Sequence, residues 1–113
     1  MTVTSSTIDG VLAALADPTR RQLLDQVSTR GQATASTLAD GLPISRQAVV
    51  KHLAVLDAAG LVEATRVGRE VRYAVRPQAL DTTARWMASL AADWDRRLAK
   101  IKRVAEAAER AAR

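Results

Sequence analysis

The pattern of apolar and polar residues predicts a first helix over residues 4–16. Apolar side chains recur there at intervals of three and four residues, as one face of a helix requires: Ile8, Val11, Leu12 and Leu15. Ser6 is a candidate N-cap for this helix, with Asp9 three residues later in a weaker form of the capping box. The segment therefore predicts an amphipathic helix with a single apolar stripe.

A second helix is predicted from Pro18 to about Ser28. Asp17 is a favoured N-cap residue, and proline suits the first helical position because its missing amide is not needed there. Gly31 follows this segment and is expected to end the helix. The first two helices are thus separated by a very short connection.

Two more helices are predicted around a short turn. Thr34 is a candidate cap for a helix over 35–40, and Ser45 is a candidate cap for a helix over 46–59. The connection between them is about four residues long and contains a glycine. This arrangement is typical of a helix-turn-helix motif, which we place at about 35–59.

Alternating residues then predict a β-hairpin over about 61–75. The strand candidates are 61–67 and 70–75, and only Gly68 and Arg69 separate them, which suits a two-residue type II′ turn. Pairing of Val67 with Glu70 would place one set of side chains on the same face: Val62, Ala64, Val71, Tyr73 and Val75. A hairpin after a helix-turn-helix motif predicts a wing.

A long final helix is predicted over about 78–110, and its apolar residues follow a 3.5-residue period. These residues are Leu80, Ala84, Met87, Ala91, Trp94, Leu98, Ile101, Ala105 and Ala108. A sustained period of this kind marks a seam between two helices. The helix would be on the order of 45 Å long, too long for so small a chain to cover. We therefore expect Met87, Ala91, Trp94, Leu98 and Ile101 to pack on a second copy of the chain.

The fourth helix carries two faces of different chemistry. Val49, Leu53 and Leu56 lie on the face expected to pack inward, whereas a polar and basic set points elsewhere: Arg46, Gln47, Val50 and Lys51. The second helix of such a motif enters the DNA major groove with its N-terminal half. There arginine can bind guanine, glutamine can bind adenine and valine can contact a thymine methyl group. Ser45 and the free amides at the helix start could hold a phosphate.

Three arginines crowd the tip and the outer edge of the hairpin. Arg66, Arg69 and Arg72 would lie on the DNA backbone or in the minor groove if the hairpin acts as a wing. A single exposed arginine is most often only a solvated charge. Together with the polar face of the fourth helix, the three predict an interface for double-stranded DNA.

Composition agrees with a mainly α fold that carries a small β-hairpin. The 113 residues are 48% hydrophobic but only 3% aromatic, so the core must be aliphatic, and we expect a single winged-helix domain over 1–113. The net charge of +5 favours polyanionic partners.

The absence of cysteine excludes disulfides and thiolate catalysis. Because no nucleophile–base pattern, phosphate loop or metal-ligand cluster is present, we do not expect an enzyme. No signal peptide or membrane span is evident, so we expect a cytoplasmic protein without a membrane partner.

The run from Asp17 through Val75 resembles the ArsR/SmtB family of winged-helix repressors. The matching pieces are DPTRRQLL, STLADGLPISRQAVVKHLAVLDAAGLV and RVGREVRYAV. The second piece is the most specific, because its length, turn and AGLV exit all agree. The resemblance implies a repressor that binds an imperfect palindrome as a homodimer joined by its first and last helices. It therefore adds Ile8 and Leu12 to the expected dimer contacts.

The known metal sites of that family are missing from this sequence. Where metal-sensing members have a cysteine motif, this chain reads TASTLADGL, and its last helix has no histidine. The only histidine, His52, lies in the fourth helix and is expected to pack or to contact a phosphate. The segment RWMASLAADWDRRLAKI instead resembles a cysteine-free branch of the family. We expect no metal and no cofactor, whereas an unidentified small-molecule inducer stays open. Trp86 and Trp94 would line its pocket or only pack.

Two other functions stay open at this point. The winged helix could be a module for protein–protein contact, and a steep loss of DNA affinity with salt would argue against this. It could also be a metal-responsive repressor with an oxygen-ligand site made by Asp81, Asp93 and Asp95 across the dimer. Operator affinity that does not change with zinc or a chelator would exclude that site.

Overall fold

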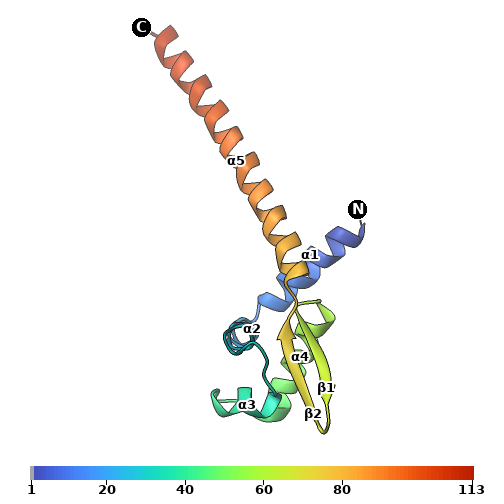
Figure 1. Ribbon diagram of the computed structural model, residues 1–113. Helices are drawn as coiled ribbons and strands as arrows, with labels where there is room; N and C mark the ends of the chain where they lie inside the picture. Colours follow the sequence, from blue (N-terminus) through green and yellow to red (C-terminus); the bar gives the residue numbers. More distant parts are fainter. Residues whose placement is uncertain (1) are drawn as a thin grey trace. The chain divides into compact units, whose positions relative to one another are not determined.

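The computed structural model describes the backbone of residues 2–113 and the side chains from Ser6 onward. The chain divides into two units, Met1–Thr83 and Ala84–Arg113. The elements in chain order are α1 (Thr2–Leu15), α2 (Pro18–Arg30), α3 (Ala35–Asp40), α4 (Arg46–Ala58), β1 (Val62–Val67), β2 (Glu70–Val75) and α5 (Pro77–Ala111) (Figure 1). The predicted fold class, mainly α with a small hairpin, is confirmed.

Side-chain caps begin three of the four helices for which the sequence predicted them, α2, α3 and α4. The carboxylate of Asp17 accepts hydrogen bonds from the amides of Thr19, at 2.7 Å, and Arg20, at 3.3 Å. The hydroxyl of Thr34 accepts from the Thr37 amide at 3.2 Å. These bonds satisfy amides that have no partner inside the helix. The starts of α2 and α3 are therefore confirmed.

The predicted cap at Ser6 is wrong. α1 already begins at Thr2, so Ser6 lies inside the helix. Serine and threonine cost a helix well under about 1 kcal/mol each relative to alanine, so a short run of them does not stop it. The capping pattern was present in the sequence, but nothing forced the chain to leave the helix there.

The end of α4 is a Schellman motif centred on Gly60. The Gly60 amide donates to the Asp57 carbonyl, and the Leu61 amide donates to the Leu56 carbonyl, both at 2.9 Å. This geometry needs a positive φ, which is +78° at Gly60 and is easily adopted only by glycine. Leu56 and Leu61 are both fully buried, so the motif also fixes the direction in which the chain enters β1.

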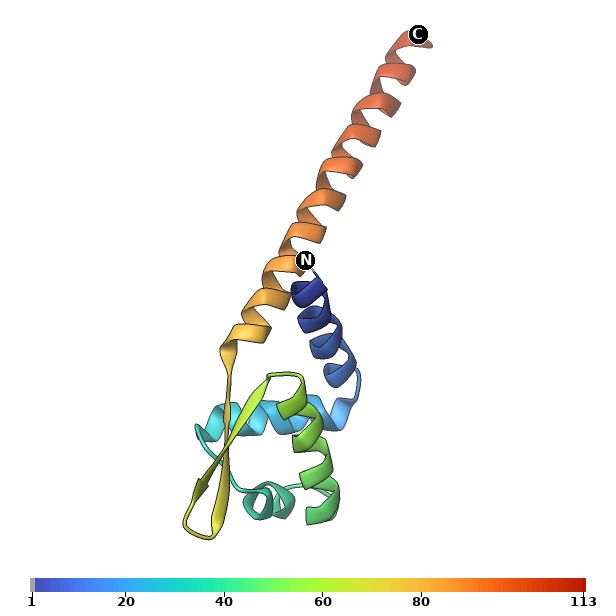
Figure 2. The same ribbon diagram turned by 90° about the vertical axis from the view of Figure 1, so that its right-hand side faces the viewer.

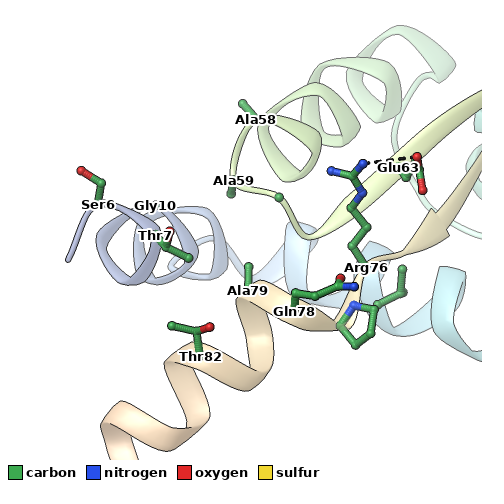
Figure 3. A pocket seen from close by; sticks show the side chains of 13 residues that line it. Ser6, Thr7, Gly10, Ala58, Ala59, Glu63, Arg76, Gln78, Ala79 and Thr82 are labelled. Atoms are coloured by element: carbon green, nitrogen blue, oxygen red, sulfur yellow. Dashed lines mark hydrogen bonds and ion pairs between the residues drawn. The ribbon is translucent and has the colours of Figure 1, made fainter. Parts of the chain in front are cut away.

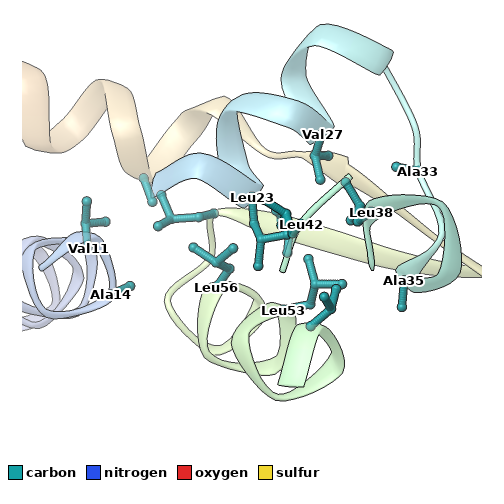
Figure 4. Packing of buried hydrophobic residues seen from close by; sticks show 14 residues of the cluster. Val11, Ala14, Leu23, Val27, Ala33, Ala35, Leu38, Leu42, Leu53 and Leu56 are labelled. Atoms are coloured by element: carbon teal, nitrogen blue, oxygen red, sulfur yellow. The ribbon is translucent and has the colours of Figure 1, made fainter. Parts of the chain in front are cut away.

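The core of the first unit is aliphatic, as its composition predicted. Figure 4 shows the buried side chains of α2 and α4 meeting beneath the hairpin, among them Leu23, Leu53 and Leu56. All three are fully buried. Tyr73 and Val75 of β2 pack against this cluster from the hairpin. The inward face predicted for α4 is therefore confirmed.

The hairpin has the predicted register and one further contact. Val67 pairs with Glu70 and Val62 with Val75, in antiparallel order. Ala33, in the connection between α2 and α3, also pairs with Tyr73: each amide donates to the other's carbonyl, at 3.0 and 2.8 Å. This bridge holds the middle of β2 against the connection that leads into the helix-turn-helix motif.

α5 is one continuous helix of 35 residues, and most of it belongs to the second unit. Its apolar residues in that unit stay exposed: Trp86, Met87, Leu90, Trp94, Leu98, Ile101 and Val104. Among residues 2–113, no helix combines the length and the apolar character that a membrane span needs.

Candidate nucleic-acid interface

α4 is held by its inner face and presents its outer face to solvent. Val49, Leu53 and Leu56 are fully buried on the inside. The hydroxyl of Ser45 accepts from the Ala48 amide at 3.1 Å, which fixes the first turn of the helix. The outer face is thus carried on a helix whose position is set by packing and by its cap.

The predicted reading residues lie together on the exposed side of α4. Gln47 and Lys51 are exposed, and Val50 is 37% exposed although valine is usually buried. An amide, a methyl-bearing side chain and an ammonium group within five residues match the chemistry of base edges and phosphates. The structure brings these three residues to one surface.

Arg46 differs from its neighbours because its guanidinium already has a partner. Its Nε donates to the hydroxyl of Ser36 in α3 at 3.0 Å. This bond links the starts of the two helices of the motif. Sequence reasoning missed Ser36, since residues ten apart on different helices give no local signal. With Nε engaged, the outer nitrogens of Arg46 are the groups left to contact DNA.

The tip of the hairpin is a two-residue turn that presents Arg69. Gly68 has a φ of +63°, and Arg69 has no positive φ, as a type II′ turn requires. Arg69 is exposed. In both views the tip lies at the same end of the first unit as α3 and the start of α4 (Figures 1 and 2). One flat partner could therefore touch both.

The other two hairpin arginines lie on opposite faces of the sheet. Arg66 pairs with Val71 and shares its face, whereas Arg72 pairs with Thr65 on the other face. Arg69 therefore lies at the tip, and Arg66 and Arg72 lie beside it on the two faces of the hairpin. Side chains along a strand alternate between its two faces. Arg66 is one residue from the pair Val67–Glu70 and Arg72 is two residues from it, so the two arginines point to opposite sides.

Arg72 is also partly neutralised. Its Nε donates to the Glu70 carboxylate at 3.2 Å, and the two side chains line a small hollow of about 330 Å³ with Thr34 and Thr37. An ion pair at the surface contributes little to stability, but it lowers the positive charge available to a phosphate. The sequence analysis used Glu70 only for the strand register and did not identify it as the partner of Arg72. Because of this ion pair, Arg72 is the weakest of the predicted wing contacts.

His52 belongs to a cluster that joins three helices. Its Nδ1 lies 3.4 Å from a terminal nitrogen of Arg20, and the Arg20 Nε donates to the Ala14 carbonyl at 2.7 Å. Arg20 also lies 3.6 Å from the Asp17 carboxylate. The half-buried His52 therefore packs against the helix ends rather than standing free on the surface of α4.

Asp17 is the acidic member of this cluster. Desolvation raises the pKa of its carboxyl, but hydrogen bonds from the Arg20 and Thr19 amides and the positive charge of Arg20 outweigh it. The pKa of Asp17 consequently lies below its ordinary value. The cap of α2 is thus charged across the neutral range.

A larger hollow of about 1060 Å³ lies at the other end of the hairpin, between α1, the end of α4 and the first turn of α5 (Figure 3). The Arg76 guanidinium donates to the Glu63 carboxylate at 3.2 Å on its wall. Neither tryptophan lines this hollow or the smaller one beside Arg72. The hollow is open to solvent. Among the described residues that line it, the only charged side chains are Arg76 and Glu63, which pair with each other.

The expected dimer contacts differ in exposure. Ile8 is only 7% exposed within one chain, whereas Leu12 is 42% exposed. Met87, Trp94, Leu98 and Ile101 are more than half exposed. The ring of Trp94 carries the Arg97 guanidinium 5.2 Å from its centroid, within the range of a cation–π contact. Ile8 thus has little surface left to offer a partner, and α5 has much.

Acidic residues of α5 do not gather into a site within one chain. Over residues 2–113, no group of three or more His, Asp or Glu side chains is placed to hold a metal ion. Asp93 is instead engaged by Arg96 one turn later in the helix.

Comparison with known proteins agrees with this geometry. A helix-turn-helix domain model matches residues 15–65. The transcriptional repressor SdpR of Bacillus subtilis is 31% identical over 80 residues, which cover 71% of this chain and 88% of SdpR.

Solved structures extend the likeness to the whole fold. An ArsR-like transcriptional regulator from Rhodococcus sp. RHA1 superposes with a TM-score of 0.79 at 48% identity, over 89% of this chain and 94% of its own. The homodimeric winged helix-turn-helix DNA-binding domain of a possible ArsR-family regulator from Mycobacterium bovis superposes with a TM-score of 0.65 at 25% identity, over 81% and 83%. Sequence and structure therefore agree that this chain belongs to the ArsR family of helix-turn-helix transcriptional regulators.

Proposed function

We propose that this protein is a homodimeric repressor that binds an imperfect palindrome in double-stranded DNA. The observation that carries the proposal is the outer face of α4. Gln47, Val50 and Lys51 are exposed on a helix whose opposite face is fully buried. A rigid helix with an exposed polar face at its N-terminal half is what major-groove recognition needs.

Each residue of α4 has a distinct role in this proposal. Gln47 reads adenine through two hydrogen bonds, and Val50 contacts a thymine methyl group. The outer nitrogens of Arg46 reach a guanine or a phosphate, while its bond to Ser36 sets the direction of the side chain. Lys51 and Ser45 hold phosphates and so set the register of the helix on the duplex.

The hairpin supplies contacts that carry no sequence information. Arg69 at the tip lies on the DNA backbone or in the minor groove, and Arg66 supports it from one face of the hairpin. Arg72 contributes least, because Glu70 already engages it. The bridge between Ala33 and Tyr73 keeps this wing in a fixed position relative to α3.

A second copy of the chain completes the DNA-binding surface. The apolar seam of α5, with Met87, Ala91, Trp94, Leu98 and Ile101, packs on the same seam of the partner, and Leu12 of α1 adds to it. Ile8 contributes mainly to the packing of its own chain, because only 7% of it is exposed. Support comes from the exposure of the seam and from the homodimeric relative of Mycobacterium bovis. Two reading helices should then meet half-sites about 34 Å apart.

The family's known metal sites have no counterpart in this chain, so a small-molecule inducer stays open as the signal that releases the repressor. The chain has no cysteine, and its single histidine packs against Arg20. We place the protein in the cytoplasm, where its operator is.

Selection from a pool of random duplexes tests this function. The purified protein should enrich a palindromic sequence, and replacing Gln47 by alanine should then weaken operator binding by roughly 1–3 kcal/mol with little effect on random DNA. Replacing Arg69 by glutamine should weaken both and lower the salt slope by about 1.

Gln22→Ala is the matched control, because it removes the same side chain from an exposed position of α2. It should bind like the parent protein. A pool without enrichment would contradict sequence-specific binding, and a Gln47→Ala variant with unchanged affinity would contradict the role given to α4.

A further inference from the structure

Positive charge is divided very unevenly along this chain. Residues 1–95, which include α4 and the hairpin, hold ten lysines and arginines against ten aspartates and glutamates. Residues 96–113 hold seven against two. The whole net charge of +5 therefore lies in residues 96–113, which are the second half of α5 and the two residues after it, outside the proposed reading surface.

Part of this charge forms a stripe on the side of α5 opposite the apolar seam. Lys100, Arg103 and Arg110 each follow a seam residue by two positions, after Leu98, Ile101 and Ala108. Two residues correspond to about 200° around a helix, so each basic side chain points away from the seam. We call these three residues the basic stripe.

The basic stripe is free to bind a partner. All three residues are exposed, and none makes an ion pair with any residue that the structure describes. The other cations of this segment are more often engaged: Arg96 pairs with Asp93, Lys102 with Glu106, and Arg97 lies over Trp94. The three free charges face one direction along nearly three turns of helix.

We propose that the basic stripe is a second DNA-binding surface, which holds the phosphate backbone of duplex DNA without reading its sequence. This proposal rests on the proposed function. Only when a second copy covers the apolar seam is the basic stripe the side of α5 that a partner can reach. A row of exposed cations with no aromatic side chain among them neutralises phosphates but offers nothing to base edges. Because residues 1–95 are neutral overall, the long-range electrostatic attraction of this protein for DNA comes from residues 96–113.

Duplex DNA fits this surface better than a lipid bilayer does. An amphipathic helix binds a bilayer by burying its apolar face among the lipid chains. In the dimer the apolar face of α5 is covered by the other copy, so only the charged side is available. The dimer also presents the stripe twice, which doubles the number of phosphates that one assembly can hold.

A salt titration of full-length variants tests the basic stripe. Lys100, Arg103 and Arg110 are replaced together by glutamine, a good helix former that removes the charge. Replacing Arg97, Lys102 and Arg113 by glutamine is the matched control. The charge change in residues 96–113 is the same, but Arg97 and Lys102 lie on other sides of the helix and Arg113 lies beyond its end. Affinity for a random duplex is measured between 50 and 200 mM salt, and vesicles with anionic phospholipids are measured in parallel.

The stripe variant should lose about 2–3 from the slope of log affinity against log salt for each copy bound, because about 0.9 is lost per phosphate contact. The control should lose less than about 1. Equal losses in both variants, or no loss in either, would overturn the proposal. Binding to vesicles that the stripe variant loses while its DNA slope stays unchanged would overturn it in favour of a membrane surface.

Two further measurements keep the result decisive. Circular dichroism and sedimentation should match the parent protein, and if the triple variant is unfolded, Arg103→Gln alone should lower the slope by about 0.9. The ratio of operator to random affinity reports on α4 and not on the stripe. A parent protein without operator preference would contradict the proposed function, while the random-duplex slope would still decide the basic stripe.

Discussion

The first unit and the second half of α5 both carry regular apolar patterns, but they differ in what covers them. Leu53 of α4 is fully buried by its own chain, whereas Leu98 of α5 is 59% exposed. Periodicity shows which face of a helix is apolar. It does not show whether that face is buried by the same chain or by a second copy. The change from an irregular stripe in α1–α4 to a strict 3.5-residue repeat in α5 is what distinguishes a domain core from a helix–helix seam.

The largest effect on stability should come from a cavity in the core of the first unit. Leu53→Ala removes a fully buried side chain where α2, α3 and α4 meet, and it should lower the free energy of unfolding by about 2–5 kcal/mol. Urea or thermal denaturation measures the change. Val50→Ala, on the exposed side of the same helix, is the control and should change stability by less than about 0.5 kcal/mol. Equal losses in the two variants would mean that α4 does not have the two faces described.

A charge in the exposed seam should leave folding intact and break association. Leu98→Asp should raise the dimer dissociation constant roughly 100-fold or more, because burial of about 1.5–3 kcal/mol is lost in each copy. Sedimentation velocity over a range of concentrations measures this. Ala99→Asp places the same charge on the next residue, away from the seam, and should stay dimeric. A Leu98→Asp variant that sediments as a dimer would contradict the assignment of the seam.

The smallest effect should come from the charged cluster at the edge of the core. The pKa of Asp17 is lowered in the folded state, so the unfolded chain binds its proton more readily. The stability that the charge contributes is therefore present above the ordinary value of 3.8 and is lost as the pH falls through the folded pKa. Asp17→Asn keeps a good cap but removes the charge. The melting temperature should fall below that of the parent at neutral pH, and the two should converge in acid.

Asp25→Asn is the control for this change, because it removes the same charge from an exposed position of α2. Its melting temperature should stay near that of the parent at every pH. A difference between parent and Asp17→Asn that grows as the pH falls would give the opposite sign and would rule out the proposed role of the carboxylate.

Local chemistry explains why so much of the fold was predictable from the sequence. The caps at Asp17, Thr34 and Ser45 need only a few neighbouring residues, and all three were identified. The two-residue turn at Gly68 and Arg69 set the register of the hairpin in the same way. Ser6 failed because a cap residue is permitted inside a helix, so its presence is not enough to begin one.

The parts that were missed depend on residues far apart in the sequence. The Ser36 partner of Arg46 and the bridge from Ala33 to Tyr73 exist only once the elements are packed. The placement of Arg66 and Arg72 on opposite faces is different, because the pairing of Val67 with Glu70 already implied it. That pairing was predicted from the sequence, so the faces of these two arginines could be predicted with it.

The tight turn between β1 and β2 also limits how this hairpin can change its length during evolution. Each added residue lengthens a strand by about 3.4 Å, but an odd shift of register exchanges the two faces of the strand. Growth by one residue in each strand at the turn would keep every existing pair and move Arg69 outward. A single insertion in one strand would turn Arg66 toward the other side or force a bulge. Wings of related proteins that keep this turn should therefore differ in length by even numbers of residues.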